Sequence, residues 1–138
     1  MKIYLGGGIH GMAFDTANGW RGKATRELGL AGHEAINPLR HRLWKDASEQ
    51  GQFNSNELVH RDLRDVQRAD ALLVEYSNEN RNYTGTDTEM ALARYLWHKP
   101  VIVVVGERKT WSPWLNHLAT KIVTDLEEAI EYICILDD

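Results

Sequence analysis

Two acidic residues, Asp62 and Glu89, fall on the apolar faces of two predicted helices. On a wheel that turns about 100° per residue, each acid lies inside a stripe of hydrophobic side chains. The stripe around Asp62 holds Leu58, Val59, Leu63, Val66 and Ala69, and the stripe around Glu89 holds Met90, Leu92, Ala93, Leu96 and Trp97. A carboxylate on a buried face is costly unless it is paired, hydrogen-bonded or open to a cavity. Either both acids reach solvent near the helix ends, or they line one pocket in which burial perturbs a pKa.

The first predicted strand ends in a glycine-rich turn, Gly6-Gly7-Gly8-Ile9-His10-Gly11. Glycines let the backbone approach a ligand closely, and backbone amides there can hold an anion. A tight turn without a ligand is the alternative. The turn is not a phosphate loop, because no Gly-Lys-Ser/Thr follows it, and it lacks the dinucleotide-binding spacing.

The other reactive residue types form no recognisable pattern. The six histidines show no ligand spacing with carboxylates, so we expect no metal and no cofactor. No serine or cysteine stands in a pattern with His and Asp that suggests a hydrolytic triad. The cluster Arg40-His41-Arg42 either clamps a phosphate or belongs to a solvated loop. Cys134 lies near the end of an apolar helix and is expected in the core.

The elements that carry these residues alternate between strands and helices. We predict strands over 3–5, 34–37, 71–75, 101–105 and 122–124, and helices over 55–68, 85–98 and 125–135. A further helix is predicted before them, capped by Asp15 or Thr16 and running through Leu28. Segment 39–53 is polar and aperiodic, which predicts a long loop or an irregular helix. Alternating βαβ units imply a parallel sheet with helices on both faces. We therefore expect one α/β domain, residues 1–138, with a doubly wound, flavodoxin-like, five-stranded parallel sheet and a ligand beyond the carboxyl ends of its strands.

Composition narrows the class of protein. Of the 138 residues, 43% are hydrophobic and 26% are charged, which is typical of a soluble globular domain. The net charge of -4 argues against a protein that binds nucleic-acid backbones. The longest apolar run, 101–105, is too short to span a bilayer, and the N-terminus has no signal-peptide core. With one cysteine and no internal disulfide, we expect a cytoplasmic protein that binds a small molecule and neither nucleic acid nor membrane.

An ordered set of short motifs runs from Met1 to about Val105. It consists of Lys2-Ile3-Tyr4-Leu5 before the glycines, Trp20-Arg21, Gly32-His33, Asn37-Pro38-Leu39, Arg61-Asp62-Leu63, Ala69-Asp70, Gly85-Thr86 with Glu89, and Lys99-Pro100-Val101. At these spacings the set resembles the nucleoside 2-deoxyribosyltransferase family and its nucleoside 5′-monophosphate N-glycosidase relatives. The resemblance selects the same two acids as the helical wheel.

The resemblance implies a role for each of these residues. Glu89 would be the nucleophile that attacks the anomeric carbon of a (deoxy)ribosyl group, and Tyr4 would position it through a hydrogen bond. Asp62 would lie near the leaving base and assist proton transfer. N-glycosidic cleavage passes through an oxocarbenium-like state, which one carboxylate can trap as a covalent glycosyl-enzyme while a second acid protonates the base. The implied substrate-binding residues are Gly6, Gly7 and Gly8 on the sugar side and Thr84, Gly85 and Thr86 beneath Glu89, with His10, Arg21 and Arg40 as candidate phosphate partners.

Three functions stay open on these residues. The leading one is a transferase that exchanges nucleobases on 2′-deoxynucleosides. The alternative is a hydrolase that cleaves nucleoside 5′-monophosphates to base and sugar phosphate. The third is a non-catalytic nucleotide-binding module, which has no need of an inward nucleophile such as Glu89. The base, the sugar and the presence of a phosphate are not fixed, because the loop 41–54 matches nothing in the family.

The segment 111–117, Trp-Ser-Pro-Trp-Leu-Asn-His, is rich in aromatic residues, and its proline is expected to interrupt or open a helix. Exposed aromatic residues on a small domain often mark a contact surface. The alternative is that Trp111 and Trp114 pack over the edge of the sheet. Members of the resembled family are oligomeric and borrow residues from a neighbouring subunit. We therefore expect a homo-oligomer in which Asn116 or His117 reaches a neighbour's substrate.

Overall fold

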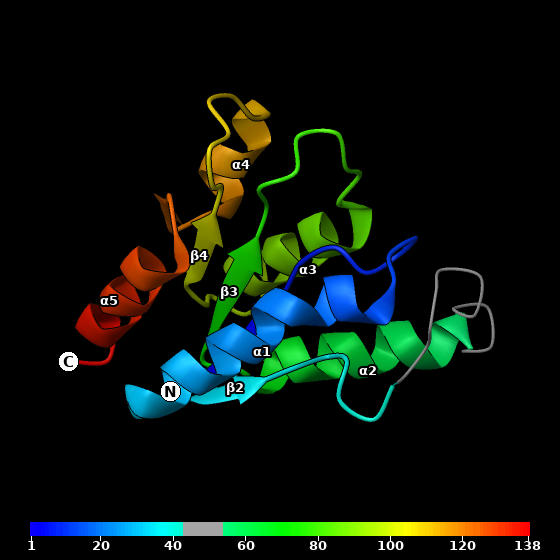
Figure 1. Ribbon diagram of the computed structural model, residues 1–138, viewed down its shortest axis with the longest axis horizontal. Coiled ribbons are helices and arrows are strands. Elements are labelled where there is room, and N and C mark those ends of the chain that lie inside the picture. Colours follow the sequence, from blue (N-terminus) through cyan, green and yellow to red (C-terminus); the bar gives the residue numbers. More distant parts are fainter. Residues whose placement is uncertain (43–53) are drawn as a thin grey trace.

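Five parallel strands form a single sheet in the order β2-β1-β3-β4-β5 (Figure 1). The computed structural model describes residues 1–42 and 54–138, so most of the predicted loop 39–53 lies outside the described residues. The strands are β1 (Lys2–Gly6), β2 (Glu34–Ile36), β3 (Ala71–Glu75), β4 (Val101–Val104) and β5 (Lys121–Val123). The predicted doubly wound parallel sheet is confirmed, and the strand ends differ from the predicted ones by a residue at most.

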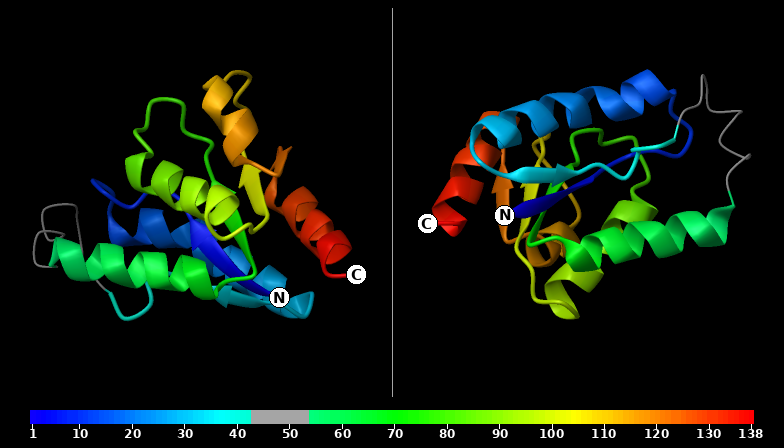
Figure 2. Two further views of the ribbon diagram at one scale, coloured as in Figure 1. Left: turned by 180° about the vertical axis from the view of Figure 1, so that it is seen from behind. Right: turned by 90° about the horizontal axis from the view of Figure 1, so that it is seen from below.

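Helices cover both faces of the sheet (Figure 2). One face carries α1 (Phe14–Leu30) and α5 (Leu126–Leu136), and the other carries α2 (Ser55–Arg68), α3 (Thr84–Tyr95) and α4 (Pro113–Leu118). Because side chains alternate along a strand, Ile3 and Leu5 of β1 pack toward α1 and α5, while Tyr4 points toward α2 and α3. None of the described helices is long and apolar enough to cross a membrane.

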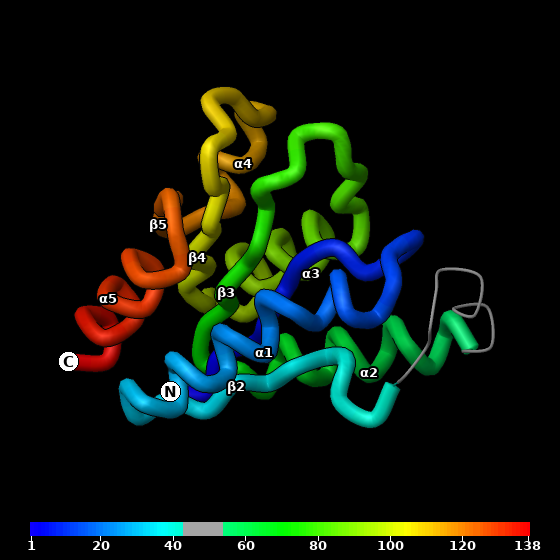
Figure 3. The backbone as a smooth tube through the Cα atoms, in the orientation of Figure 1, coloured from blue at the N-terminus to red at the C-terminus, as the bar shows by residue number. Residues whose placement is uncertain are grey.

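The strand order reverses at β1, which pairs with β2 on one side and with β3 on the other. The chain crosses from β1 to β2 through α1 on one face of the sheet and from β2 to β3 through α2 on the opposite face (Figure 3). The carboxyl ends of β1 and β3 therefore form a topological switch point, where diverging loops leave a crevice. Ligands of open α/β sheets bind in such crevices.

Helix ends follow local sequence signals at most positions. Asn54 caps α2 by accepting a hydrogen bond from the amide three residues on (3.1 Å), and Asp125 caps α5 as predicted. Pro113 is at the start of α4 and so opens a helix rather than interrupting one. The prediction for α1 is wrong at its start: the helix begins at Phe14, after Ala13, without a side-chain cap.

Lys99 closes the carboxyl end of α2. Its Nζ donates to the carbonyl oxygens of Val66 (3.2 Å), Gln67 and Ala69. The last carbonyls of a helix have no partner within the helix, and a cation there also complements the helix dipole. This contact fixes α2, which carries Asp62, relative to the start of β4.

Three residues predicted to be buried are exposed. Val59 and Leu96 are each 58% exposed, because the amino-terminal part of α2 extends beyond the strands and α3 ends at Tyr95, before Leu96 (Figure 2). Cys134 is exposed on α5. The buried side of α5 runs through Ala129 and Ile133. Cys134 follows Ile133 and is turned about 100° around the helix axis, away from that side. Apolar residues near a helix end are thus poorly placed by a wheel alone.

Candidate active site

The switch point holds a cavity of about 410 Å³, here called the Glu89 cavity. Its walls come from the glycine-rich turn after β1, from α2, from the loop between β3 and α3, and from the first turns of α3. The lining residues are Gly7, Gly8, Ile9, His10, Arg42, Ser55, Leu58, Asp62, Arg81, Asn82, Tyr83, Gly85, Thr86 and Glu89. Asp62 and Glu89 thus face one cavity, which is the second of the two interpretations of their wheel positions.

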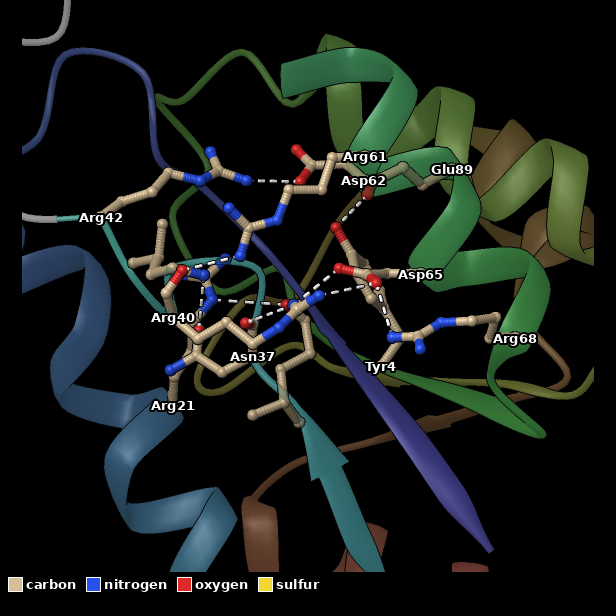
Figure 4. Close-up of polar contacts among 12 residues, drawn as sticks. Tyr4, Arg21, Asn37, Arg40, Arg42, Arg61, Asp62, Asp65, Arg68 and Glu89 are labelled. Carbon is tan, nitrogen blue, oxygen red and sulfur yellow. Dashed lines mark hydrogen bonds and ion pairs between the residues drawn. The ribbon is translucent and has the colours of Figure 1, made fainter. Parts of the chain in front are cut away.

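Glu89 is hydrogen-bonded to Tyr4, the contact that the family resemblance implies. Tyr4 is 1% exposed, and its Oη donates to Glu89 Oε2 (Figure 4). Burial raises the pKa of Glu89 from 4.5 to about 7, and the hydrogen bond from Tyr4 opposes that rise. Burial and the nearby carboxylate raise the pKa of Tyr4 well above 10.0, so the phenol keeps its proton and stays a donor. Glu89 therefore titrates near neutral pH.

Asp62 is paired with Arg42, a residue that the sequence analysis places only in a basic cluster. Arg42 Nη2 lies 2.5 Å from Asp62 Oδ1, and the two side chains are 5% and 21% exposed (Figure 4). Burial raises the pKa of Asp62 above 3.8, while the Arg42 guanidinium opposes the rise. The second acid of the cavity is thus a half-desolvated carboxylate held by a buried cation.

Arg40, a candidate phosphate partner, is instead committed to an ion pair outside the cavity. Its two terminal nitrogens lie 2.6 and 2.9 Å from the two oxygens of Asp65, which is buried. Arg68 Nη2 lies 2.9 Å from Asp65, and Arg61 donates to the Arg40 carbonyl (2.8 Å). Two-pronged arginine–carboxylate pairs fix geometry. The turn after β2 is therefore fastened to α2 and carries Arg42 with it.

Arg21 lies beneath the glycine-rich turn and does not line the cavity. It is fully buried, and it donates to the carbonyls of Leu5 (3.3 Å), Gly8 (3.5 Å) and Ala17. Burial lowers its pKa to about 10, so it is still a cation at neutral pH. Its Nε and Nη1 donate to the backbone, which gives Arg21 a part in shaping the turn, and its Nη2 is buried with no hydrogen-bond partner among the described residues. The substrate contact predicted for Arg21 stays a prediction.

Close contacts require the glycines of this turn. A Cβ at Gly7 would lie 3.0 Å from Trp20 Cζ2, and one at Gly8 would lie 2.1 Å from Arg81 Nε. Gly6 lies deeper, at the end of β1, and does not line the cavity. Gly7 and Gly8 therefore allow two large side chains to pack directly on the backbone at the cavity wall.

A polar hollow of about 440 Å³ adjoins the Glu89 cavity, here called the Arg81 hollow. The two share His10, Arg81, Asn82 and Gly85, and the hollow is also lined by Asn78, Asn80 and Thr84. Arg81 Nη2 donates to the His10 carbonyl, and its Nε is buried without a hydrogen-bond partner in the part of the chain that the structure describes. No carboxylate is among the described residues that line the hollow. Of the predicted residues before Glu89, Thr84 thus belongs to the hollow, and Gly85 and Thr86 line the cavity.

Asn116 and His117 lie on α4 and do not line the Glu89 cavity of this chain. Trp111 Nε1 donates to Asn116 Oδ1 (3.0 Å), and Tyr95 Oη donates to the His117 carbonyl (2.9 Å). His117 lines a separate hollow of about 800 Å³ between α3 and α4, here called the α3–α4 groove. Trp111 packs against the core, whereas Trp114 is 73% exposed. A contribution of α4 to a neighbouring subunit's site stays a prediction.

Of the two arginines that line the cavity, Arg42 is predicted only as part of the cluster Arg40-His41-Arg42, and Arg81 has no predicted role. Both come from irregular segments, where no periodicity tells which way a side chain points. The sequence hints at a place near the site only through the preceding strands: Arg42 follows β2 and Arg81 follows β3, and both strands pair with β1 at the switch point. Within residues 1–42 and 54–138, no group of three or more histidine, cysteine, aspartate or glutamate side chains could hold a metal ion.

The fold and the cavity together indicate which chemistry the site can perform. The fold is a doubly wound α/β sheet, and its switch-point cavity holds a carboxylate hydrogen-bonded to tyrosine together with a second carboxylate. One carboxylate as nucleophile and another as acid and base are the groups that glycosyl-bond chemistry uses.

Known proteins of this fold include a deoxyribosyltransferase and an N-glycosidase. No family model and no curated protein sequence matches the chain. The 2-deoxyribosyltransferase of the psychrotolerant bacterium Bacillus psychrosaccharolyticus is 20% identical, with a TM-score of 0.73, over 96% of this chain and 92% of that one. A conserved protein from Enterococcus faecalis is 17% identical, with a TM-score of 0.68 and 95% of each chain covered. The CMP N-glycosidase of Clostridium botulinum is 13% identical, with a TM-score of 0.58, over 98% of this chain and 99% of that one.

At these identities the likeness shows a shared fold. At that level it confirms the resemblance to the nucleoside 2-deoxyribosyltransferase family and its N-glycosidase relatives. The two neighbours with a named activity, a deoxyribosyltransferase and a nucleotide N-glycosidase, correspond to the two branches of that resemblance.

Proposed function

We propose that the protein is an N-glycosyl enzyme that breaks the bond between a nucleobase and a (deoxy)ribosyl group through a covalent intermediate on Glu89. The observation that carries the proposal is the Tyr4–Glu89 hydrogen bond in a cavity that Asp62 also lines. A binding module gains nothing from a desolvated carboxylate, which is costly to keep. A nucleophile gains reactivity from the same desolvation.

In the first step, ionised Glu89 attacks the anomeric carbon and forms an ester bond with the sugar. The carbon–nitrogen bond breaks, and its electron pair leaves with the base. Protonated Asp62 supplies the proton that neutralises the leaving base. Tyr4 holds the attacking carboxylate in place and limits how far burial raises its pKa.

In the second step, a second nucleobase attacks the glycosyl–Glu89 ester and gives its proton to the Asp62 carboxylate. The products are a new nucleoside and free Glu89, so the net reaction exchanges nucleobases. The glycine-rich turn, with Gly7, Gly8 and His10, and the start of α3, with Gly85 and Thr86, border the space left for the sugar.

Product analysis tests this function directly. The protein is incubated with a panel of 2′-deoxynucleosides and their 5′-monophosphates, with and without a second free base, and the products are separated by chromatography. Exchange only when the second base is present supports the transferase, and release without it supports a hydrolase. Binding of the substrates without any turnover by the wild type would leave a non-catalytic binding module.

A second candidate function, hydrolysis of nucleoside 5′-monophosphates, is favoured by the Arg81 hollow. The hollow adjoins the cavity, contains amide and hydroxyl groups, and has an arginine with an unpartnered Nε. Such a hollow suits a phosphate. In this reaction, water replaces the acceptor base in the second step.

The variant Arg81→Met separates the two substrate classes. If the phosphate binds in the hollow, kcat/KM for monophosphates falls about 10- to 100-fold and that for nucleosides changes little. Arg94→Met, on α3 outside both the hollow and the cavity, is the matched control and should leave both substrates unaffected. Equal losses on nucleosides and monophosphates would rule out a phosphate in the hollow.

We also propose a homo-oligomer that buries the α3–α4 groove. Tyr95 and Trp114 border this groove and are 61% and 73% exposed, respectively, which is unusual for large aromatic residues on a lone domain. Light scattering at micromolar concentration should report more than one chain, and Trp114→Ser should shift the population toward the monomer. Mixed Glu89→Ala and His117→Ala chains should regain activity if sites are shared between subunits. A fully active monomer would overturn the proposal.

A further inference from the structure

A buried arginine in the Glu89 cavity is unused by the reaction steps described above. Arg42 is 5% exposed and lines the cavity together with Asp62 and Glu89. Its Nη2 is taken by Asp62, while its Nε is buried with no hydrogen-bond partner within residues 1–42 and 54–138. A buried, unpartnered guanidinium N–H costs free energy, which native proteins rarely leave uncompensated. In a cavity, the missing acceptor can come from a ligand.

The position of Arg42 is set by the chain around it. The Arg42 amide donates to the Leu39 carbonyl (3.0 Å), and His41 between them takes a left-handed conformation with φ of 65°. The neighbouring Arg40–Asp65 pair fastens the turn to α2. Left-handed backbone is uncommon for residues other than glycine, so this turn is closely specified. The guanidinium is therefore preorganised beside the second acid.

Arg42 lines the cavity beside both acids of the proposed reaction. It pairs with Asp62, proposed to protonate the base, and its charge also lowers the pKa of Glu89, proposed to attack the sugar. A group placed between these two acids faces the glycosidic nitrogen and the atoms next to it. The other charged or titratable groups around Asp62 are Tyr4 of β1, Arg21 of α1, Arg40 of the turn after β2, Arg61 and Asp65 of α2, and Glu89 of α3.

We propose that Arg42 contacts the nucleobase, donating from its free edge to the acceptor atom beside the glycosidic nitrogen, which is O2 of a pyrimidine or N3 of a purine. This inference rests on the proposed N-glycosyl chemistry. As the carbon–nitrogen bond breaks, its electron pair enters the base ring system and increases the negative charge on that acceptor. Arg42 holds this charge until the Asp62 proton reaches the base. The contact is stronger in the transition state than in the bound substrate, so it accelerates the step.

If Arg42 had a purely structural role, its removal would change activity in a different pattern. Arg40–Asp65 and Arg42–Asp62 are two ion pairs between the same turn and the same helix, and of the four residues only Arg42 and Asp62 line the cavity. If Arg42 serves only to fasten the turn, removing either arginine has the same kind of effect. If it contacts the base, its removal matters only when the acceptor atom is present.

The test is a cycle between the residue and one atom of the substrate. Wild type, Arg42→Met, Arg42→Lys and the control Arg40→Met are each assayed with a purine 2′-deoxynucleoside and with its 3-deaza analogue, in which N3 is replaced by C–H. With the parent substrate, Arg42→Met should lower kcat/KM about 10- to 100-fold, the size of a lost charge-assisted hydrogen bond. With the 3-deaza analogue, the same variant should lose less than about 3-fold. Arg42→Lys should fall between wild type and Arg42→Met, because it keeps the charge without the fixed fork.

Binding to the inactive Glu89→Gln background repeats the cycle without turnover. Calorimetry should give a weaker Kd for the parent nucleoside after Arg42→Met and no further weakening for the 3-deaza ligand. If the wild type turns over no substrate while this binding cycle holds, the proposed function fails and the Arg42 contact stands. Equal losses on both ligands, or losses in Arg40→Met as large as in Arg42→Met, would overturn the contact. If Arg42→Met does not fold, the wild-type protein is compared on the two substrates alone. A rate and an affinity for the 3-deaza analogue equal to those for the parent nucleoside would exclude the contact.

Discussion

Two hollows flank α3, and each is lined by an acid of that helix that accepts a hydrogen bond from a tyrosine. In the Glu89 cavity, Tyr4 donates to Glu89, and in the α3–α4 groove, Tyr76 donates to Asp87 (2.7 Å). The groove is the larger of the two, at about 800 Å³ against about 410 Å³. Size and a tyrosine–carboxylate pair therefore do not by themselves distinguish a reactive site from a surface hollow.

The surroundings of the two pairs differ. Burial raises the pKa of Glu89 to about 7, and it also raises the pKa of Asp87, which lies in a more open place. The Glu89 cavity adds a second acid and two arginines, but the described residues lining the groove include no arginine and no acid besides Asp87. Only the cavity lies at the switch point of the sheet. Convergent charged groups at that place, and not the pair alone, support chemistry.

The largest difference between the hollows is expected from removing each acid. Glu89→Ala should lower kcat by at least about 1,000-fold with the fold intact, because positioning alone cannot replace a nucleophile. Asp87→Ala should lower kcat less than about 10-fold, since Asp87 faces the groove. Steady-state rates and circular dichroism of both variants check this. Wild-type-like rates in Glu89→Ala, or equal losses in the two variants, would remove the distinction.

The next largest effect concerns the second acid. Asp62→Asn keeps the shape of the side chain but cannot deliver a proton, so rates on substrates with poor leaving bases should fall about 100- to 1,000-fold. Substrates with activated leaving groups, which need no proton, should be largely rescued. A series of nucleosides with leaving groups of graded acidity measures this. Equal losses on good and poor leaving groups would make Asp62 a binding or structural residue.

Removing each tyrosine hydroxyl should give a smaller effect that depends on pH. The Tyr4 hydrogen bond lowers the pKa of Glu89, so Tyr4→Phe should raise that pKa above about 7. Attack requires ionised Glu89, and activity is lost as pH falls through its pKa. The acid side of the pH–rate profile should therefore move to higher pH, with a loss of about 10-fold at pH near 6 and a smaller one at high pH. Tyr76→Phe should leave the profile unmoved, and a shift of the same size there would show that the effect is not specific to the cavity.

The smallest effect is on stability. The folded pKa of Glu89 is raised to about 7 from 4.5, so the folded protein holds a proton that the unfolded chain releases, and stability falls as pH rises between these values. Glu89→Gln removes the buried charge and should raise Tm by a few degrees above neutral pH, with the gain shrinking toward about pH 5. Thermal unfolding across this pH range measures it. Glu131→Gln on the exposed side of α5 serves as control, and a gain independent of pH in Glu89→Gln would contradict the burial of its charge.

The sequence predicts most elements because the central strands are apolar runs and because α2 and α5 begin at side-chain caps. Residues 71–74 and 101–105 form continuous apolar runs, the pattern of parallel strands that are buried on both faces of a sheet. Asp62 and Glu89 can be found by periodicity, since an acid on an apolar stripe has few inexpensive explanations. The start of α1 and the exposure of Val59 escape prediction, because nothing local records where a helix leaves the sheet.

The arginines show where sequence reasoning stops. Arg40 and Arg42 stand two positions apart in one basic cluster, yet Arg40 pairs with Asp65 outside the cavity and Arg42 lines it. Their difference depends on the left-handed conformation of His41, which no composition or periodicity reveals. The contact of Arg81 with Gly8 joins loops that follow different strands, so it too depends on the tertiary fold.

The central claim is that Glu89, and not Asp87, carries the glycosyl group. It is tested by incubating the protein with a slow fluorinated 2′-deoxyribosyl substrate, digesting it with a protease, and sequencing the modified peptide by mass spectrometry. We expect one added fluorodeoxyribosyl group on Glu89, which is absent in Glu89→Gln and unchanged in Asp87→Asn. An adduct on Asp87 or another residue, or continued turnover of the substrate with no adduct on Glu89, would contradict it.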